Sequence, residues 1–300
     1  MLQQELDAAI AGWRTAADEG FASAQYSLGR LFYDGYGVAE TDKEAVLWFT
    51  KAAEQGHAAA QLHLMIMHDE GRGVAQSSVE ATRWSKKAAD QGFQRAQAIL
   101  GTRYEEGRGV SQSDVEAVRW YKKAAGKGDV FAQVKLGIMY QNGRGRGVLQ
   151  SDMEAVRWLK KAAEQEDTNA QFRLACLHAK VGSVVHSDVE AARWCRKAAE
   201  RGDATSQFNL GLRYETGSSG SGVAHSDEQA AYWYRKAADQ GMAAAQCGLG
   251  VLYEEGRGVT KSDEKALQWY QEAALQGSSR ACCNMGQMLE VGRGVAQNHD

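Results

Sequence analysis

A glycine-rich turn that contains an arginine recurs along the chain and is the first pattern that could do chemistry. Gly-Arg-Gly-Val stands at residues 71–74, 107–110, 256–259 and 292–295. Such a turn could hold a phosphate, but phosphate-binding loops follow a strand and have a fuller glycine signature before a helix. The pattern therefore favours a turn that needs positive φ, with the arginine as a solvated or capping side chain.

The histidines do not have the spacing of a metal site. A helical metal pair needs two ligands about three or four residues apart on one face. His63 and His68 are five residues apart, and His57 lies near the expected start of a helix. No Ser-His-Asp or Cys-His combination stands out from the repeated Ser, Asp and Glu either. The sequence therefore predicts no catalytic residue, no metal site and no cofactor.

The cysteines follow no disulfide framework. There are five of them, all in the second half of the chain, and no Cys-x-x-Cys occurs. They are Cys176, Cys195, Cys247, Cys282 and Cys283. We expect buried free thiols in a reducing compartment.

Charge and hydropathy exclude several classes of protein. The 35 basic and 38 acidic side chains give a net charge of −3, so no general basic field attracts nucleic acid. No run approaches the ~18 apolar residues that cross a bilayer. Met1 leads into a polar, amphipathic stretch rather than a signal peptide. We expect no nucleic-acid ligand and no membrane span, and we favour a cytoplasmic location.

The chain is built from a sequence repeat. Ala-Ala pairs recur in steps of 36, 36, 36, 38, 36, 39 and 36 residues, and all eight tryptophans follow the same period. We therefore predict one array over residues 1–300. Its units are approximately 1–20 (half), 21–56, 57–92, 93–128, 129–166, 167–202, 203–241, 242–277 and 278–300 (half). Longer loops at 143–148 and 217–223 explain the steps of 38 and 39.

Each unit has the pattern of two helices. The first contains the tryptophan, and Ser113 with Glu116 illustrates the capping box at its start. A glycine such as Gly128 supplies its left-handed cap, and Glu166 replaces that glycine in one unit. The second helix contains Ala-Gln, Leu-Gly and Tyr at offsets 0, +4, +5 and +8, where small residues let neighbouring helices approach closely.

The combined pattern, A-Q-x-x-LG-x-x-Y-x-x-G-x-GV-x-x-S/D-x-x-EA-x-x-WY-x-KAA-x-x-G, resembles the Sel1-like repeat family, relatives of tetratricopeptide repeats. The resemblance covers essentially all 300 residues and is weakest in the fifth unit, where Ala175 and His178 replace the glycine and the tyrosine. It implies an all-α fold, a right-handed α/α superhelical solenoid of about eight antiparallel helix pairs. It also implies an adaptor function, without identifying the partner.

The face of the second helix that varies between units is the candidate binding surface. Offsets −1, +3, +7 and +10 are expected to turn away from offsets 0, +4 and +8. By analogy with tetratricopeptide-like solenoids, this stripe would line the concave side. It offers cations, amides for an extended peptide backbone and adaptable methionines. The candidate partner-binding residues are Arg95, Arg103, Lys135, Met139, Asn142, Asn169, Arg173, Asn209 and Arg213. A solvated helix face is the alternative interpretation.

These observations favour a non-enzymatic scaffold that binds a protein or peptide, acidic in character, along the inner groove. One alternative is a β-lactamase-like hydrolase, which the resemblance suggests through secreted members with regularly paired cysteines; that pairing is missing here. Another alternative is a regulatory or immunity-type inhibitor of a partner enzyme. No polar terminal caps are visible, so we expect a fragment of a longer protein or end-to-end self-association.

Overall fold

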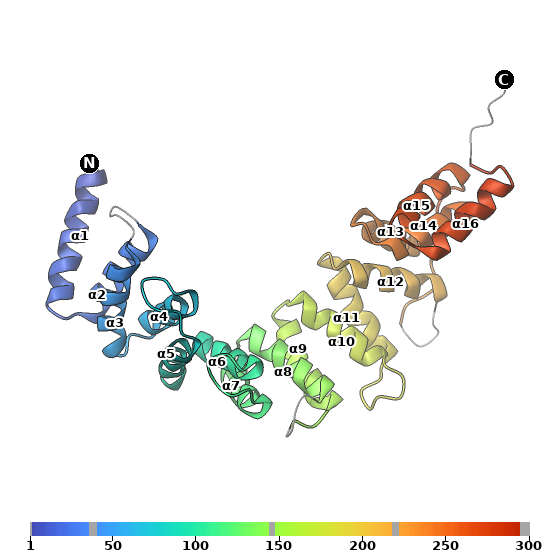
Figure 1. Cartoon of the computed structure of the whole chain (residues 1–300). Helices are drawn as coiled ribbons and strands as arrows, with labels where there is room; N and C mark the ends of the chain where they lie inside the picture. Colours follow the sequence, from blue (N-terminus) through green and yellow to red (C-terminus); the bar gives the residue numbers. More distant parts are fainter. Residues whose placement is uncertain (1, 36–40, 144–147, 218–221, 295–300) are drawn as a thin grey trace. The chain divides into compact units, whose positions relative to one another are not determined.

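The computed structural model describes residues 2–35, 41–143, 148–217 and 222–294, and within them it contains sixteen helices and no strand (Figure 1). The helices are α1 (Leu2–Asp18), α2 (Ala22–Asp34), α3 (Asp42–Glu54), α4 (Ala58–Glu70), α5 (Ser78–Asp90), α6 (Gln94–Glu106), α7 (Asp114–Gly126), α8 (Val130–Asn142), α9 (Asp152–Glu164), α10 (Thr168–Ala179), α11 (Asp188–Glu200), α12 (Ala204–Thr216), α13 (Asp227–Asp239), α14 (Ala243–Glu255), α15 (Asp263–Leu275) and α16 (Ser279–Glu290). The predicted all-α class is confirmed. The predicted loop insertions lie largely in residues 144–147 and 218–221, outside the described part of the chain.

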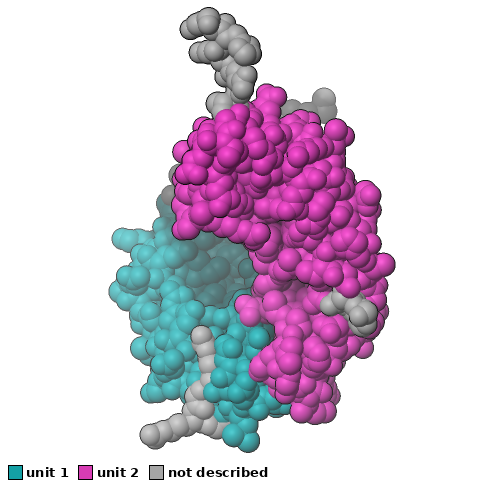
Figure 2. All heavy atoms as spheres, turned by 90° about the vertical axis from the view of Figure 1, so that its right-hand side faces the viewer, with its two compact units in different colours: residues 1–151 teal, residues 152–300 magenta. Residues whose placement is uncertain are grey.

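The chain divides into two compact units, residues 1–151 and residues 152–300 (Figure 2). Helices α1 to α8 belong to the first unit and α9 to α16 to the second. A single array over residues 1–300 stays a prediction, and each unit is described by itself below. No helix among the described residues is both long and apolar enough to cross a membrane.

Two kinds of helix alternate along each unit. The odd-numbered helices, here called A helices, contain the tryptophans, and the even-numbered B helices contain the Ala-Gln pairs. Within each unit, a B helix packs closely against the A helix that follows it in that unit, as in α6 with α7 and α12 with α13. Each pair is therefore a hairpin whose B helix leads into the next A helix.

Local sequence sets where the helices begin and end. Ser113 accepts a hydrogen bond from the backbone N–H of Glu116 at 3.3 Å, and Asp129 does the same for Ala132 at 2.8 Å. At helix ends a residue turns into the left-handed region, as Gly107 does with φ 72°. Glu166 adopts φ 67° and is the one non-glycine residue in the described part of the chain with positive φ. It therefore holds the cap position that glycine holds in the other units. The position of Glu166 in the repeat predicted this.

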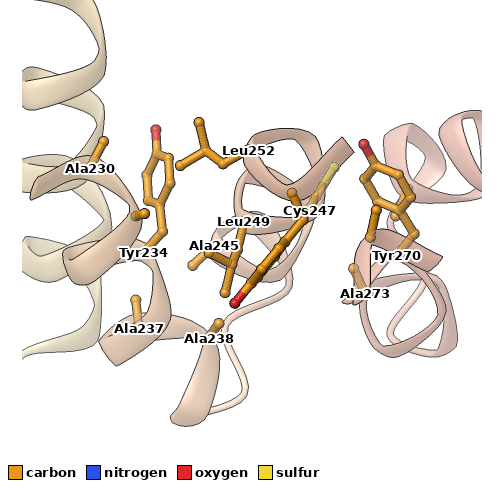
Figure 3. Close-up of a cluster of buried hydrophobic side chains, with 14 of the residues drawn as sticks. Ala230, Tyr234, Ala237, Ala238, Ala245, Cys247, Leu249, Leu252, Tyr270 and Ala273 are labelled. Carbon is orange, nitrogen blue, oxygen red and sulfur yellow. The ribbon is translucent and has the colours of Figure 1, made fainter. Parts of the chain in front are cut away.

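The core between the helices is made of small alanines and of larger side chains from both kinds of helix. In Figure 3, Tyr234 of α13 and Tyr270 of α15 lie on either side of α14, which contributes Leu249 and Leu252. Leu249 and Leu252 are fully buried. Because alanines such as Ala245 add little bulk, the helix axes approach closely enough for these rings to fill the space.

The glutamine of each Ala-Gln pair ties a B helix to the A helix before it. Gln61 is buried, and its Nε2 donates to the backbone oxygen of Ala53 at 2.9 Å. Its Oε1 accepts from Nε2 of Gln91, 30 residues later, at 2.9 Å. Gln61 therefore uses both ends of its buried amide, which would be costly to leave unpaired.

The cysteines differ from expectation. Cys195 and Cys247 are buried, and burial raises the pKa of Cys195 to about 12. Cys176, Cys282 and Cys283 are exposed, so the prediction of buried thiols is wrong for these three. Two of them lie on α16, which has no later helix to cover its outer face among the described residues.

Candidate partner-binding site

The predicted binding stripe is only partly open. Arg103 is 3% exposed and Met139 is 1% exposed, so the prediction that offset +7 faces outward is wrong for both. Seven residues turn an α-helix through about 700°, about 20° short of two full turns, so offset +7 shares the face of offset 0. The same offset is buried in five other units and half-buried in one. The buried residues are Leu31, Met67, Leu177, Leu252 and Met288, and the half-buried residue is Arg213.

The remaining candidate residues lie nearer the surface. Arg95, Asn142 and Asn169 are exposed, whereas Lys135, Arg173, Asn209 and Arg213 are half-buried. Lys135 pairs with Glu105 at 3.0 Å, and Nε of Arg173 donates to Asn169 at 2.9 Å on the same helix. These contacts occupy Lys135 and Arg173 within the chain.

A pocket of about 620 Å³ opens in the first unit between α4, α6 and the start of α8, and we call it the α6 pocket. Its apolar lining consists of Met65, Ala98, Ile99 and Phe131. Its polar lining consists of Asp69, Gln94, Arg95, Thr102, Arg103, Arg108 and Asp129. The volume falls within the range of ligand pockets in general, which are apolar cavities with a few polar groups.

Arg103 belongs to the interior of this pocket. Its guanidinium bonds to the carboxylate of Asp69 and donates to Oγ1 of Thr82 at 3.1 Å. In the next hairpin the matching carboxylate, Glu105, accepts instead from the hydroxyl of Tyr121 at 2.7 Å. Helix α5 has Ser85 where α7 has this tyrosine, so Arg103 replaces the missing hydroxyl. Arg103 is therefore an internal partner of Asp69 rather than a free cation.

The arginines of the Gly-Arg-Gly turns have a structural role. Arg72 pairs with Asp42 at 2.7 Å, and both residues are mostly shielded from solvent. The other two equivalent pairs among the described turns are Arg257 with Asp227 at 2.8 Å and Arg293 with Asp263 at 2.7 Å. In each case the aspartate is 30 residues earlier, at the start of an A helix. The prediction of solvated or merely capping arginines is wrong for these three.

Arg108 is the exception among these turns, because residue 78 is serine where α3, α7, α9, α11, α13 and α15 have aspartate. Arg108 has a single ion pair among the described residues, a 3.7 Å contact with Glu106, and both side chains are about half exposed or more. It lines the α6 pocket together with Arg95, for which no ion pair occurs within the described residues. Two available cations thus flank an apolar floor.

Arg95 and Arg103 both line this pocket, and its other lining residues were not among the candidate residues. Two signals were present. Ser78 breaks a column of aspartates, which releases Arg108. Met65 and Ser85 replace the usual glycine and aromatic residue, which changes the interior of the hairpin. Lys135, Asn142, Asn169 and Arg173 line neither the α6 pocket nor a second pocket in the other unit, which contains Asn209 and Arg213.

Titratable residues do not assemble into a metal centre in the described part of the chain. No group of three or more His, Cys, Asp or Glu residues there could hold an ion.

The Sel1 repeat matches the sequence over residues 22–57, 58–93, 94–129, 130–167, 168–203, 204–242, 243–278 and 279–300. The chain belongs to the Sel1-repeat family. Sel1-repeat proteins generally mediate protein–protein interactions, and the family scaffold is typically non-enzymatic. The predicted family and the all-α solenoid fold are confirmed.

Two solved Sel1-repeat structures are similar to this one. A protective antigen of uropathogenic Escherichia coli, which displays an SLR fold, is 33% identical with a TM-score of 0.75. A Sel1 repeat protein from Oxalobacter formigenes is 35% identical with a TM-score of 0.74. Each match covers 95% of this chain, which spans 60% of the first protein and 81% of the second. The comparison with curated proteins gave no match.

Proposed function

We propose that this Sel1-repeat protein binds a segment of a partner protein in the α6 pocket, and that the segment combines a bulky apolar side chain with a neighbouring carboxylate. The observation that supports this most is the apolar floor of a pocket of about 620 Å³ beside two available arginines. Arg103 and Asp69 neutralise each other inside the pocket, so the outward positive charge comes from Arg95 and Arg108.

The two parts of the ligand contribute differently. Burying one large apolar side chain against Ile99 and Phe131 provides roughly 1.5–3 kcal/mol. Phe131 is 51% exposed, so an incoming side chain has apolar surface to cover. A carboxylate can accept two parallel hydrogen bonds from an arginine, which orients the segment. Affinity should therefore depend on both groups and fall with salt.

The negative charge of Asp129 limits where the carboxylate of the bound segment can lie in the pocket. Its carboxylate caps α8 by accepting from the N–H of Ala132 at 2.8 Å, and Asp129 lines the pocket. A second carboxylate placed near it would be repelled. The acidic residue of the bound segment therefore lies toward Arg108.

A selection from a random peptide library displayed on phage tests this function. The full chain should enrich peptides with an aromatic or long aliphatic residue next to Asp or Glu. Ala98 is buried at the pocket wall, so Ala98→Trp should fill the space and bind the selected peptides at least ten times more weakly.

A second variant protects the test against misfolding. Arg95→Glu with Arg108→Glu changes two exposed residues and should also weaken peptide binding at least tenfold, with an unchanged melting temperature. Arg83→Glu, an exposed change on α5 outside the pocket, is the matched control and should bind normally. Equal affinity of the pocket variants and the wild type would refute the proposal.

A further inference from the structure

The second unit contains an independent pocket of about 350 Å³, which we call the α10 pocket. It does not depend on the function proposed for the first unit. Its lining residues are Ala175, Cys176, Ala179, Cys195, Asn209, Leu212, Arg213 and Thr216. These residues lie on α10, α11 and α12.

The neighbouring hairpin shows what is missing from this pocket. In α12 and α13, Gly211 lies against the ring of Tyr234, and a Cβ on residue 211 would lie 2.6 Å from Cδ1 of that ring. The hydroxyl of Tyr234 donates to Glu215 at 2.6 Å. Glycine, tyrosine and glutamate thus fill the space within the hairpin.

In α10 and α11 the same three positions are Ala175, Cys195 and Ala179. All three line the α10 pocket. The hairpin therefore lacks both an aromatic ring and a carboxylate, and the pocket lies where they would stand. The hairpin of α4 and α5 also lacks the aromatic ring. There the large side chain of Met65 is buried, and Asp69 retains the carboxylate.

Because this hairpin lacks the carboxylate, Arg213 lacks the internal partner that Arg103 has in the first unit. Arg213 has the same place in α12 that Arg103 has in α6, and Arg103 bonds to Asp69 of the preceding B helix. The corresponding residue before Arg213 is Ala179. No carboxylate pairs with Arg213 within the residues that the structure describes.

The acidic residue Asp203 is not part of the lining of the α10 pocket. Its carboxylate accepts from the N–H of Ser206 at 2.6 Å as the cap of α12, and it forms no ion pair with Arg213 among the described residues. Arg213 and Cys195 line the same pocket, so the guanidinium and the vacant ring position belong to one cavity. Asn209 adds an amide at the same wall.

We propose that the α10 pocket binds an aromatic carboxylate. Its ring replaces the missing tyrosine ring beside Ala175 and Cys195, and its carboxylate replaces the missing acid beside Ala179 and pairs with Arg213. A free aromatic acid and the C-terminal phenylalanine or tyrosine of a peptide share this chemistry. Both present a ring and a carboxylate separated by two carbon atoms.

Fluorine NMR of 3-(4-fluorophenyl)propionate with the full chain tests this site. The acid should show a saturable shift, and its primary amide, which lacks the charge, should bind at least ten times more weakly. Ala179→Glu supplies an internal partner for Arg213 and should weaken binding of the acid at least tenfold. Arg193→Gln, an exposed change on α11 outside the pocket, should leave binding unchanged.

A variant that restores the common hairpin provides a second test. Ala175→Gly with Cys195→Tyr recreates the pair seen at Gly211 and Tyr234, so it should fold and also lose binding of the acid. Absence of a saturable shift with the wild-type chain, or equal affinity in the Ala179→Glu and restored variants, would overturn the proposal.

Peptides distinguish the two sources of the ligand. If Gly-Gly-Phe with a free C-terminus binds more tightly than the small acid, the natural ligand is a protein C-terminus; weaker binding points to a free aromatic acid. In both cases the amidated peptide should bind at least ten times more weakly than the free one. Equal binding of the two peptides would show that the carboxylate is not recognised, and would refute the site.

Discussion

Gly101 of α6 lies against the ring of Tyr121 of α7, so closely that a Cβ on residue 101 would stand 2.6 Å from ring atoms Cδ1 and Cε1. The ring is fully buried, and its hydroxyl reaches Glu105 at 2.7 Å. The same contact recurs between Gly29 and Phe49, Gly211 and Tyr234, and Gly250 and Tyr270. The absence of a side chain on the B helix is therefore what admits an aromatic ring from the A helix.

Gly101→Ala should destabilise the first unit by about 1–3 kcal/mol, because the added methyl group overpacks the buried ring of Tyr121. Chemical denaturation measures this change. Gly126→Ala is the matched control, since a Cβ there meets nothing within 4 Å. That helical position should become more stable by about 0.5–1 kcal/mol. Equal effects of the two substitutions would contradict the close contact.

Ser78→Asp should give Arg108 the partner that Arg72 has in Asp42. We expect a stability gain of about 0.2–1 kcal/mol, because this pair is partly exposed. Since the new pair holds Arg108 away from the α6 pocket, affinity for the library-selected acidic peptides should fall severalfold in calorimetry. Ser78→Asn has the same shape without the charge and should leave the affinity near that of the wild type. If Ser78→Asp binds the peptides as well as the wild type, Arg108 has no role in recognition.

The start of α4 should be sensitive to pH. Nδ1 of His57 accepts from the N–H of Ala60 at 3.2 Å, which requires a neutral ring. Burial and, to a smaller extent, the nearby His63 lower the pKa of His57, and burial also lowers the pKa of His63. The unfolded chain therefore binds protons first, so stability falls as pH drops below about 6.5 and through the lowered pKa of the folded state.

The amide signal of Ala60 should report this transition in a pH titration by NMR, with a midpoint below about 6.5. His57→Asp should remove it between pH about 8 and about 5.5, because aspartate is ionised throughout this range. Asp129, Asp167 and Asp203 already cap other B helices in this way. A midpoint at or above the ordinary histidine value would contradict the lowered pKa.

Glu166→Gly should stabilise the second unit by about 1–2 kcal/mol, because a side chain in the left-handed region is strained. The lost contact between Glu166 and Arg201, at 3.0 Å, is exposed and contributes little. Gly202→Glu, at the same cap position one unit later with φ 96°, should destabilise. Urea denaturation of the two variants checks both signs; a loss of stability in Glu166→Gly would be inconsistent with strain at this residue.

The same segment should exchange its amide hydrogens early. Residues 166–186 contain the non-glycine cap and lack the Gly-x-Gly-Val turn, and repeat stability is roughly a sum over units and their interfaces. Hydrogen exchange followed by mass spectrometry should show faster exchange there than in residues 94–126. Equally slow exchange in the two segments would contradict this.

The helices and their caps could be predicted because glycine, serine and the Ala-Gln pair recur at fixed spacing. Glu166 was recognisable as a strained cap for the same reason. The burial of Arg103 was missed because offset +7 was assigned to the outer face, although it lies about 20° from offset 0. The loop arginines were misread because their partners are 30 residues earlier, and a turn motif alone does not show a contact between units.

The α6 pocket could be found only by comparing the units with one another. Ser78, Met65 and Ser85 each look like ordinary variation along the sequence. Their consequence, a released Arg108 beside an apolar space, depends on where neighbouring hairpins place their side chains. The sequence signal for the pocket was that these three residues differ from the residues found at the same repeat positions in most other units.

Methyl NMR of the full chain, labelled at methionine and isoleucine and titrated with the best library-selected acidic peptide, tests the central claim most directly. Met65 and Ile99 line the α6 pocket, whereas Met153 is exposed on α9 in the other unit. We expect saturable shifts of the Met65 and Ile99 methyl signals, abolished by Arg95→Glu with Arg108→Glu, and no shift at Met153. Saturable peptide binding that leaves the Met65 and Ile99 signals unmoved would contradict the claim.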